Sequence, residues 1–137
     1  MILQQTSNLN YIPKRIISLV PSQTELLSDL GLEDETVGIT KFCVHPPGWF
    51  KTKEKIGGTK TVNIDKVLKL QPDLIIANKE ENVKEQIDAL AADYPVWVSE
   101  INNLADAMQM IADIGTLTGK SAAAGALISN ISKAFAE

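Results

Sequence analysis

The chain has 137 residues and a formal net charge of −4, from 13 lysines and arginines against 17 aspartates and glutamates. Hydrophobic residues make up 45% and charged residues 22%, the proportions of an ordinary soluble globular protein of one domain. The acidity and the dispersed lysines argue against nucleic acid as a partner, because a protein that binds the phosphate backbone needs a concentrated basic face.

The sequence shows neither a membrane span nor a secretory signal. No run approaches the ~18 apolar residues of a spanning helix. The first eight residues lack the basic and apolar regions of a signal peptide. Two alternatives stay open: the protein remains in the cytoplasm, or the export information has been lost from this chain.

Four short apolar runs predict strands. They are continuous rather than alternating and are rich in isoleucine and valine, which is typical of strands buried on both faces of a parallel sheet. The runs are residues 15–20, 36–40, 73–77 and 95–98. Helical patterns lie between them, so the chain is expected to form an α/β domain with a parallel sheet and right-handed crossovers.

Local signals predict where the first two helices begin and end. Ser22 to Glu25 matches a capping box, in which the serine side chain bonds an orphan amide and the glutamate reaches back. Gly31 suits the position just after that helix. A second helix is expected from Asn63 and should end at Gln71, because the residue before a proline avoids the helical region.

The second half of the chain predicts three more helices. Two amphipathic helices are expected over about residues 80–92 and 104–119. A fifth, over residues 120–137, carries an apolar stripe and has no glycine, asparagine or proline stop signal. The stripe consists of Leu127, Ile131, Ala134 and Phe135. Either this stripe packs on the same domain, or a following part is missing. Residues 42–62 are rich in proline, glycine and lysine and are expected to be a long loop, of a kind that is often functional.

The sequence offers no catalytic constellation. Cys43 and His45 supply too few ligands for a metal, and as nucleophile and base they need a third orienting group. Gly57 to Thr61 superficially resembles a phosphate-binding loop but lacks its spacing, and a tight turn is the alternative. We therefore expect no catalytic residue, no metal site and no resident cofactor.

Two groups of residues are candidates for ligand binding. A polar cluster, residues 78–82, directly follows the third predicted strand, where open α/β sheets form their ligand crevice. A solvated helix N-terminus is the alternative. Phe42, Trp49 and Phe50 gather aromatic rings in the long loop. These rings either contact a flat, partly apolar ligand or fold back over the sheet edge.

Three segments, in order, resemble one family. They are Pro13 to Leu27, Val37 to Thr40 leading into the Pro46-Pro47 loop, and Asn63 to Ala77. They look like the matching parts of ABC-transporter substrate-binding proteins for cobalamin, haem and ferric siderophores, with the cobalamin-binding branch most similar. The resemblance covers Pro13 to about Ile114.

The resemblance implies two α/β lobes joined by one long helix, with the ligand held between them. Residues 1–119 are then the N-terminal lobe, of three-layer Rossmann-like type, and residues 120–137 the start of the inter-lobe helix, with the second lobe absent from this chain. The resemblance also implies a transport receptor rather than an enzyme, in the periplasm or associated with a membrane. Its partners are a small metal chelate and an ABC permease.

Site residues follow from the resemblance position by position. Phe42 stands where cobalamin binders place a tyrosine on the ligand, and Thr59 where some carry a tryptophan, so one aromatic wall is lost. Asp65 matches a glutamate that docks against permease arginines, with the same charge on a side chain one methylene shorter. The resemblance assigns no role to Asn78, Lys79 and Glu80, which lie on the cleft-facing loop. The full set of expected ligand-binding residues is Phe42, Thr59, Lys60, Asn78, Lys79 and Glu80.

Two other interpretations stay open. One is a cytoplasmic ligand-sensing or interaction module derived from this lobe. The other is a small flavodoxin-like nucleotide-binding enzyme, which the missing glycine fingerprints disfavour. If the reading frame stops at Glu137, the apolar stripe of residues 120–137 predicts self-association.

Overall fold

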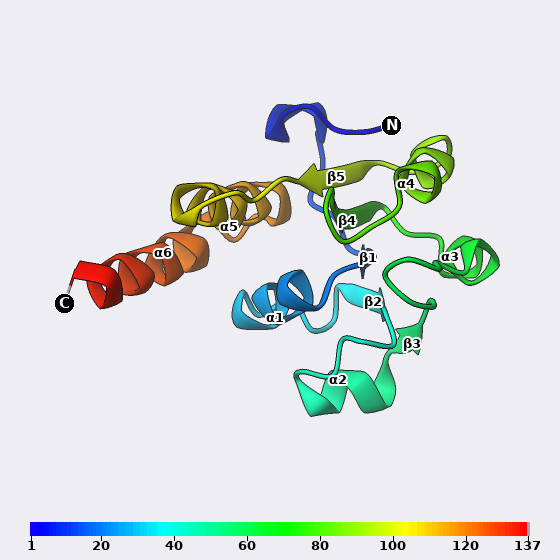
Figure 1. Cartoon of the computed structure of the whole chain (residues 1–137), viewed down its shortest axis with the longest axis horizontal. Coiled ribbons are helices and arrows are strands. Elements are labelled where there is room, and N and C mark those ends of the chain that lie inside the picture. The colour runs from blue at the N-terminus through cyan, green and yellow to red at the C-terminus, as the bar shows by residue number, and fades with distance from the viewer. Residues whose placement is uncertain (137) are drawn as a thin grey trace.

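A computed structural model describes residues 1–136. Its centre is a parallel sheet of five strands in the order β3-β2-β1-β4-β5 (Figure 1). The strands are β1 (Ile16–Ser18), β2 (Thr36–Ile39), β3 (Glu54–Lys55), β4 (Leu74–Asn78) and β5 (Val96–Ser99). The chain moves outward from β1 through β2 to β3 and then returns to the other side of β1, so the strand order reverses between β1 and β4.

Helices cover both faces of the sheet. They are η1 (Thr6–Asn8), α1 (Pro21–Asp29), α2 (Pro47–Thr52), α3 (Ile64–Leu70), α4 (Lys84–Ala91), α5 (Leu104–Thr118) and α6 (Ser121–Ala136). α1, α5 and α6 lie on one face, and α3 and α4 lie on the other (Figure 1). Within residues 1–136, every helix is too short or too polar to cross a bilayer.

The continuous apolar strands supply two cores, because successive side chains of a strand point to opposite faces. In β1, Ile16 joins the core beneath α1 and α5, and Ile17 joins the core beneath α3 and α4. β4 repeats the division with Ile76 and Ile75. All four side chains are fully buried. The expected three-layer α/β lobe with a parallel sheet is confirmed.

The prediction that residues 42–62 form one loop is wrong. The stretch contains α2 and β3, and β3 pairs with β2 through the Gly38–Glu54 and Ile39–Lys55 registers. Trp49 anchors α2 to the core and is only 5% exposed. A strand of two residues is too short to leave a hydrophobic pattern, so only its partner strand defines it.

The capping box predicted for the first helix is also wrong. α1 begins at Pro21, with Val20 as its N-cap and no side-chain cap. Proline has a helix-compatible φ and no N–H to satisfy, so it starts the helix one residue before Ser22. The end of the helix is as predicted, because Gly31 follows it with a φ of +76°.

The helix predicted over residues 80–92 begins later, at Lys84. The Asn78 side-chain oxygen accepts hydrogen bonds from the main-chain N–H groups of Glu80 and Glu81, at 2.9 and 3.0 Å. Asparagine favours such turns because its side chain imitates a backbone acceptor. The turn occupies the residues that the apolar periodicity assigned to the helix.

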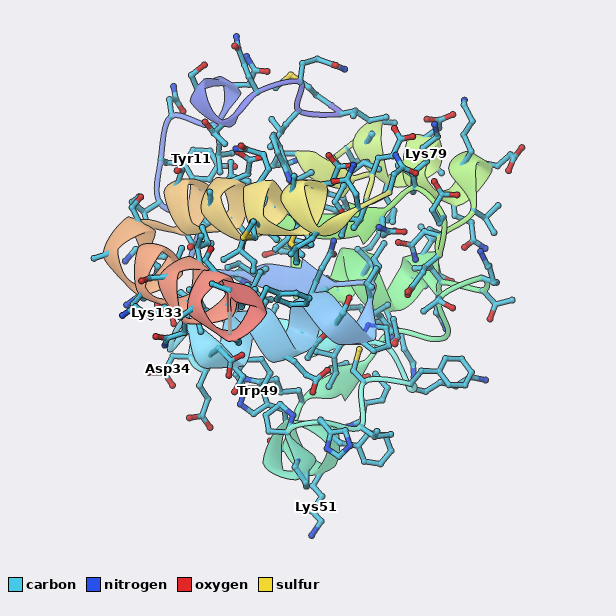
Figure 2. All side chains as sticks on the ribbon, turned by 60° about the vertical axis from the view of Figure 1, so that its left-hand side comes forward. Tyr11, Asp34, Trp49, Lys51, Lys79 and Lys133 are labelled. Carbon is cyan, nitrogen blue, oxygen red and sulfur yellow. The ribbon has the colours of Figure 1, made fainter. Side chains whose placement is uncertain are left out.

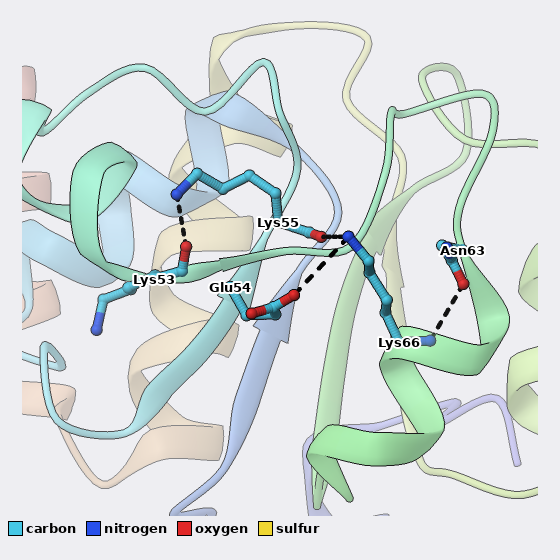
Figure 3. Close-up of polar contacts among 5 residues, drawn as sticks. All are labelled: Lys53, Glu54, Lys55, Asn63 and Lys66. Atoms are coloured by element: carbon cyan, nitrogen blue, oxygen red, sulfur yellow. Dashed lines mark hydrogen bonds and ion pairs between the residues drawn. The ribbon is translucent and has the colours of Figure 1, made fainter.

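The remaining helix boundaries follow the sequence closely. Asn63 caps α3 by accepting a hydrogen bond from the main-chain N–H of Lys66 at 3.1 Å (Figure 3). α3 ends at Leu70, and Gln71 takes a left-handed φ of 48° before Pro72. Gly119 ends α5 with a φ of +73°.

α6 packs along α5, with Ala124 against Gly115. Of its predicted stripe, Leu127 and Ile131 are partly buried on the core, whereas Phe135 is 72% exposed. The last residue of the predicted 120–137 helix, Glu137, lies outside the described residues. The division at residue 119 and the self-association of this helix stay predictions.

Candidate functional site

The loops that follow the strands gather at the carboxyl edge of the sheet. β2 leads into Phe42, β3 into Thr59 and Lys60, and β4 into Lys79 and Glu80. Open α/β sheets bind ligands at this edge, where the strand order reverses. The structure therefore places the predicted ligand-binding residues on one edge, which we call the rim (residues 40–42, 57–60 and 78–80).

Asn82 braces the rim from below and is only 5% exposed. Its side-chain amide donates hydrogen bonds to the main-chain carbonyls of Leu19, at 3.1 Å, and Thr59, at 3.0 Å. Its side-chain oxygen accepts from the main-chain N–H of Asn78 at 2.9 Å. One side chain thus joins the loops after β1, β3 and β4. The sequence placed Asn82 in the polar cluster after β4 but gave no sign of this role.

The charged residues of the rim are exposed. The Lys60 ammonium donates a hydrogen bond to the main-chain carbonyl of Glu80 at 2.9 Å. The Lys79 ammonium lies 3.3 Å from a carboxylate oxygen of Glu100, with both side chains more than half exposed. Exposed pairs of this kind are weak, so the Lys79 ammonium and the Glu80 carboxylate are available to a ligand.

Asn78 differs from its neighbours because it is buried, at 7% exposure. Besides accepting from the two N–H groups of the following turn, its amide donates to the Ser99 hydroxyl at 3.2 Å. These hydrogen bonds give Asn78 a positioning role beneath the exposed Lys79 and Glu80.

Of the three aromatic residues in residues 42–50, one is buried and two are exposed. Trp49 folds back into the core, whereas Phe42 is 54% exposed and Phe50, on α2, is 37% exposed. The Phe42 ring lies beside Gly58, where an added Cβ atom would sit 3.2 Å from a ring carbon. A side chain at position 58 would therefore crowd the Phe42 ring, and glycine avoids this.

A buried amide lies at the point where the strand order reverses. Gln23, on the first turn of α1, is 0% exposed and donates hydrogen bonds to the Ser99 hydroxyl, at 2.6 Å, and the Ala77 carbonyl, at 3.3 Å. Its side-chain oxygen has no hydrogen-bond partner among residues 1–136. Buried polar atoms are rarely left unpaired. No sequence motif had singled out Gln23.

Cys43 and His45 do not come together as a reactive pair. Cys43 is fully buried and lies 3.1 Å from each of the Thr24 and Thr40 hydroxyls, whereas His45 is exposed. Across residues 1–136 no three histidine, cysteine, aspartate or glutamate side chains are grouped as metal ligands. The Cys43 thiol is therefore part of the packed interior.

Asp65 is exposed in the first turn of α3. A carboxylate there is stabilised by the positive end of the helix dipole. A cavity of about 140 Å³ lies at the end of β5, bordered by Ser99, Glu100 and Asp106 among others. Pockets that enclose drug-sized ligands measure roughly 300–1,000 Å³. This cavity is therefore too small to enclose a ligand of that size.

Comparisons with known proteins connect this fold to transport receptors. The model of the periplasmic binding protein family matches residues 16–137. The chain is 42% identical over 78 residues to YvrC, an uncharacterised ABC transporter substrate-binding lipoprotein of Bacillus subtilis, across 57% of this chain and 24% of that protein. It is 35% identical over 88 residues to the vitamin B12-binding protein of Yersinia pestis, across 64% of this chain and 31% of that protein.

A solved structure agrees with the sequence relatives. The periplasmic vitamin B12 binding protein BtuF of Vibrio cholerae matches with a TM-score of 0.79 and 26% identity, across 88% of this chain and 48% of that one. The chain thus spans less than a third of the two curated relatives in the aligned regions and about half of the solved structure. From the family match and the shared lobe, we conclude that the chain belongs to the periplasmic binding protein family.

Proposed function

We propose that this chain is the N-terminal lobe of the substrate-binding component of an ABC importer, and that its ligand is cobalamin or an iron chelate such as haem or a ferric siderophore. The observation that carries the proposal is the rim itself, which presents Phe42, Lys79 and Glu80 on the carboxyl edge of a lobe of this family. Cobalamin is the favoured ligand, because vitamin B12-binding proteins are relatives in both sequence and structure.

The exposed side chains of the rim suit one half of a binding site. Phe42 supplies an exposed ring for the flat face of a macrocycle. Lys60, Lys79 and Glu80 supply charges for the polar periphery. The chelate is cargo, so the lobe requires no resident cofactor and no catalytic group. A second surface completes the enclosure of the ligand.

Titration with cyanocobalamin, haemin and a ferric siderophore tests the ligand class. The protein that carries this lobe is titrated while the visible absorbance of each chelate and the heat of binding are measured. Binding of one chelate is expected. If none of the three chelates binds, the proposed ligand class is contradicted.

A pair of phenylalanine variants tests the rim. Phe42→Ala is expected to weaken binding of that chelate about tenfold or more, the loss typical of one buried aromatic ring. Phe50→Ala is the matched control, because Phe50 is also exposed but lies on α2. Equal effects of the two substitutions contradict the placement of the ligand on the rim.

We propose that Asp65 docks the receptor on its permease. Its carboxylate is exposed on the first turn of α3, where a partner can reach it. Asp65→Lys is expected to abolish uptake by cells while leaving chelate affinity unchanged. Asp93→Lys is the control, since Asp93 is also an exposed aspartate. A loss of chelate affinity in the Asp65 variant, or equal loss of uptake in both, contradicts this role.

We propose that the lobe works outside the cytoplasm, on the side of the membrane from which an importer takes its substrate. The support is that its relatives include a lipoprotein and a periplasmic protein. Cell fractionation is expected to find the protein in the periplasm or attached to a membrane. A wholly cytoplasmic pool contradicts the location and favours the ligand-sensing module.

A further inference from the structure

The basic residues of this acidic chain gather on one side of the fold. Residues 41–69 hold seven of its 13 lysines and arginines and two of its 17 aspartates and glutamates. Their formal charge is +5 in a chain that totals −4, so the remaining residues carry −9. The lysines look dispersed in the sequence, but α2, β3 and α3 lie together at one end of the sheet (Figure 1).

Contacts connect three of these lysines, Lys55, Lys66 and Lys69. The Lys66 ammonium on α3 donates a hydrogen bond to the Lys55 carbonyl on β3 at 3.4 Å and lies 3.8 Å from the Glu54 carboxylate (Figure 3). The Lys55 ammonium lies 5.1 Å from the centre of the Phe50 ring on α2. Lys69 borders the same small hollow as Lys66 and Glu54.

Two more lysines belong to the same stretch of the chain. The main-chain N–H of Lys41 donates to the Gly57 carbonyl at 2.8 Å, which holds Lys41 beside the end of β3. Lys51 projects from the tip of α2, away from the body of the molecule (Figure 2). We call Lys41, Lys51, Lys55, Lys66 and Lys69 the basic face.

Lys53 is not part of the basic face. Its ammonium donates to the Glu33 carbonyl and lies 4.7 Å from the centre of the Trp49 ring. The carboxylates of Glu33, Asp34 and Glu35 act on it as nearby opposite charges. These acidic residues mark the border where the positive surface ends.

Exposed apolar side chains occur in the same part of the chain as the basic face. Val44 is 48% exposed, Phe50 37% and Leu68 43%, and all three lie within the same stretch of residues 41–69. Cations together with exposed aromatic and aliphatic groups are typical of proteins that lie on anionic bilayers, where ammonium groups meet phosphates and apolar groups enter the headgroup region. A nucleic-acid backbone attracts the cations but leaves valine and leucine in water.

We propose that the basic face on α2, β3 and α3 binds the anionic headgroups of a lipid bilayer, with Phe50 and Leu68 at headgroup level. The negative remainder of the chain is repelled by the same surface, so the molecule docks in one orientation. The contact needs neither a chelate nor a permease. Its failure and the failure of the proposed transport function are therefore distinguishable.

Co-sedimentation with vesicles tests the proposal. The chain is mixed with vesicles of phosphatidylcholine alone and with vesicles of equal parts phosphatidylcholine and phosphatidylglycerol. Binding is expected only to the mixed vesicles, and it should weaken as salt is added because salt screens the lysines. Equal binding to both kinds of vesicle, or binding to neither, overturns the proposal.

A matched pair of triple variants distinguishes the effect of the basic face from the effect of net charge. Lys41→Gln, Lys51→Gln and Lys69→Gln together are expected to weaken binding to the mixed vesicles by tenfold or more. Lys14→Gln, Lys120→Gln and Lys133→Gln together change the net charge equally but lie outside residues 41–69, and should retain binding. Equal weakening by both triple variants overturns the assignment.

A single apolar variant provides a test that leaves every charge in place. Leu68 is 43% exposed, so Leu68→Gln preserves the fold, which circular dichroism checks. The variant is expected to bind the mixed vesicles several-fold more weakly, because it removes the aliphatic group at headgroup level. Unchanged binding overturns the placement of Leu68 in the contact.

Discussion

Lys60 and Glu80 join two loops across the carboxyl edge of the sheet, because the Lys60 ammonium donates to the Glu80 main-chain carbonyl at 2.9 Å. Lys60 follows β3 and Glu80 follows β4, two strands that are not neighbours in the sheet. The bond is at the surface, so it has little energy of its own. Beneath it, the buried Asn82 connects the same two loops through Thr59 and Asn78.

Asn82 is expected to account for most of the stability of this junction. Asn82→Ala leaves the carbonyls of Leu19 and Thr59 and the N–H of Asn78 without their side-chain partner. Unpaired buried groups are destabilising, so the free energy of unfolding should fall by about 2–3 kcal/mol. The midpoint of urea denaturation measures the change.

Asn10→Ala is the control for this variant, because Asn10 is exposed. It should change the free energy of unfolding by less than about 0.5 kcal/mol. Asn82→Asp keeps the shape but places a carboxylate oxygen against two carbonyls, and should destabilise at least as much as alanine. Equal urea midpoints for the alanine variants of Asn82 and Asn10 would rule out a stabilising role of Asn82 at this junction.

The sequence predicts those parts of the fold that depend on residues close together in the chain. The isoleucine-rich runs at residues 15–20 and 73–77 predicted buried parallel strands, because a strand covered on both faces has no polar side. Asn63 and Gly31 predicted helix boundaries through their own side chain or backbone freedom. β3 escaped prediction because its two residues are defined only by pairing with β2.

The candidate site divides in the same way. The rule that ligands bind at the carboxyl ends of parallel strands predicted Lys79 as a site residue, and the family resemblance predicted Phe42. The roles of Asn82 and Gln23 depend on contacts between segments more than 20 residues apart, such as Asn82 with Leu19 and Gln23 with Ser99. A single sequence contains no local pattern for such contacts.

Gly115 and Gly125 provide a matched test of how α6 packs on α5. A Cβ atom added at Gly115 would overlap the Cβ of Ala124, whereas one added at Gly125 would meet nothing within 4 Å. Gly115→Ala is therefore expected to lower the free energy of unfolding by about 1–3 kcal/mol through overpacking. Gly125→Ala should raise it by up to about 1 kcal/mol, the helix-propensity difference between the residues.

Thermal denaturation of both glycine variants and of a compensating double variant measures this packing. In the double variant Gly115→Ala, Ala124→Gly, the methyl group moves from α6 to α5, so the overlap is removed. This variant should recover part of the stability lost by Gly115→Ala alone. Stabilisation by both single alanine substitutions would show that α6 does not rest on α5 in solution.

Tyr11 reports on the opposite, amino-terminal edge of the sheet. Its hydroxyl donates to the Asp73 carbonyl at 2.7 Å, and the Asp73 carboxylate accepts from the main-chain N–H groups of Lys14 and Arg15 at 2.8 and 2.9 Å. Partial burial, and secondly the negative charge of Asp73, raise the pKa of Tyr11 above its usual value of 10.0. Both causes disfavour the phenolate.

The direction of the pKa shift fixes the pH dependence. The folded Tyr11 keeps its proton where the unfolded chain has begun to lose it, so its contribution to stability is complete below pH 10.0 and is lost as the pH rises through the higher folded pKa. Absorbance titration of tyrosinate in a Tyr94→Phe variant isolates Tyr11, because the chain has two tyrosines. In the same background, Asp73→Asn should lower the pKa of Tyr11 part of the way towards its usual value, because the partial burial remains. Titration of Tyr11 at its usual pKa in the Tyr94→Phe variant that keeps Asp73 would contradict the packing of this edge.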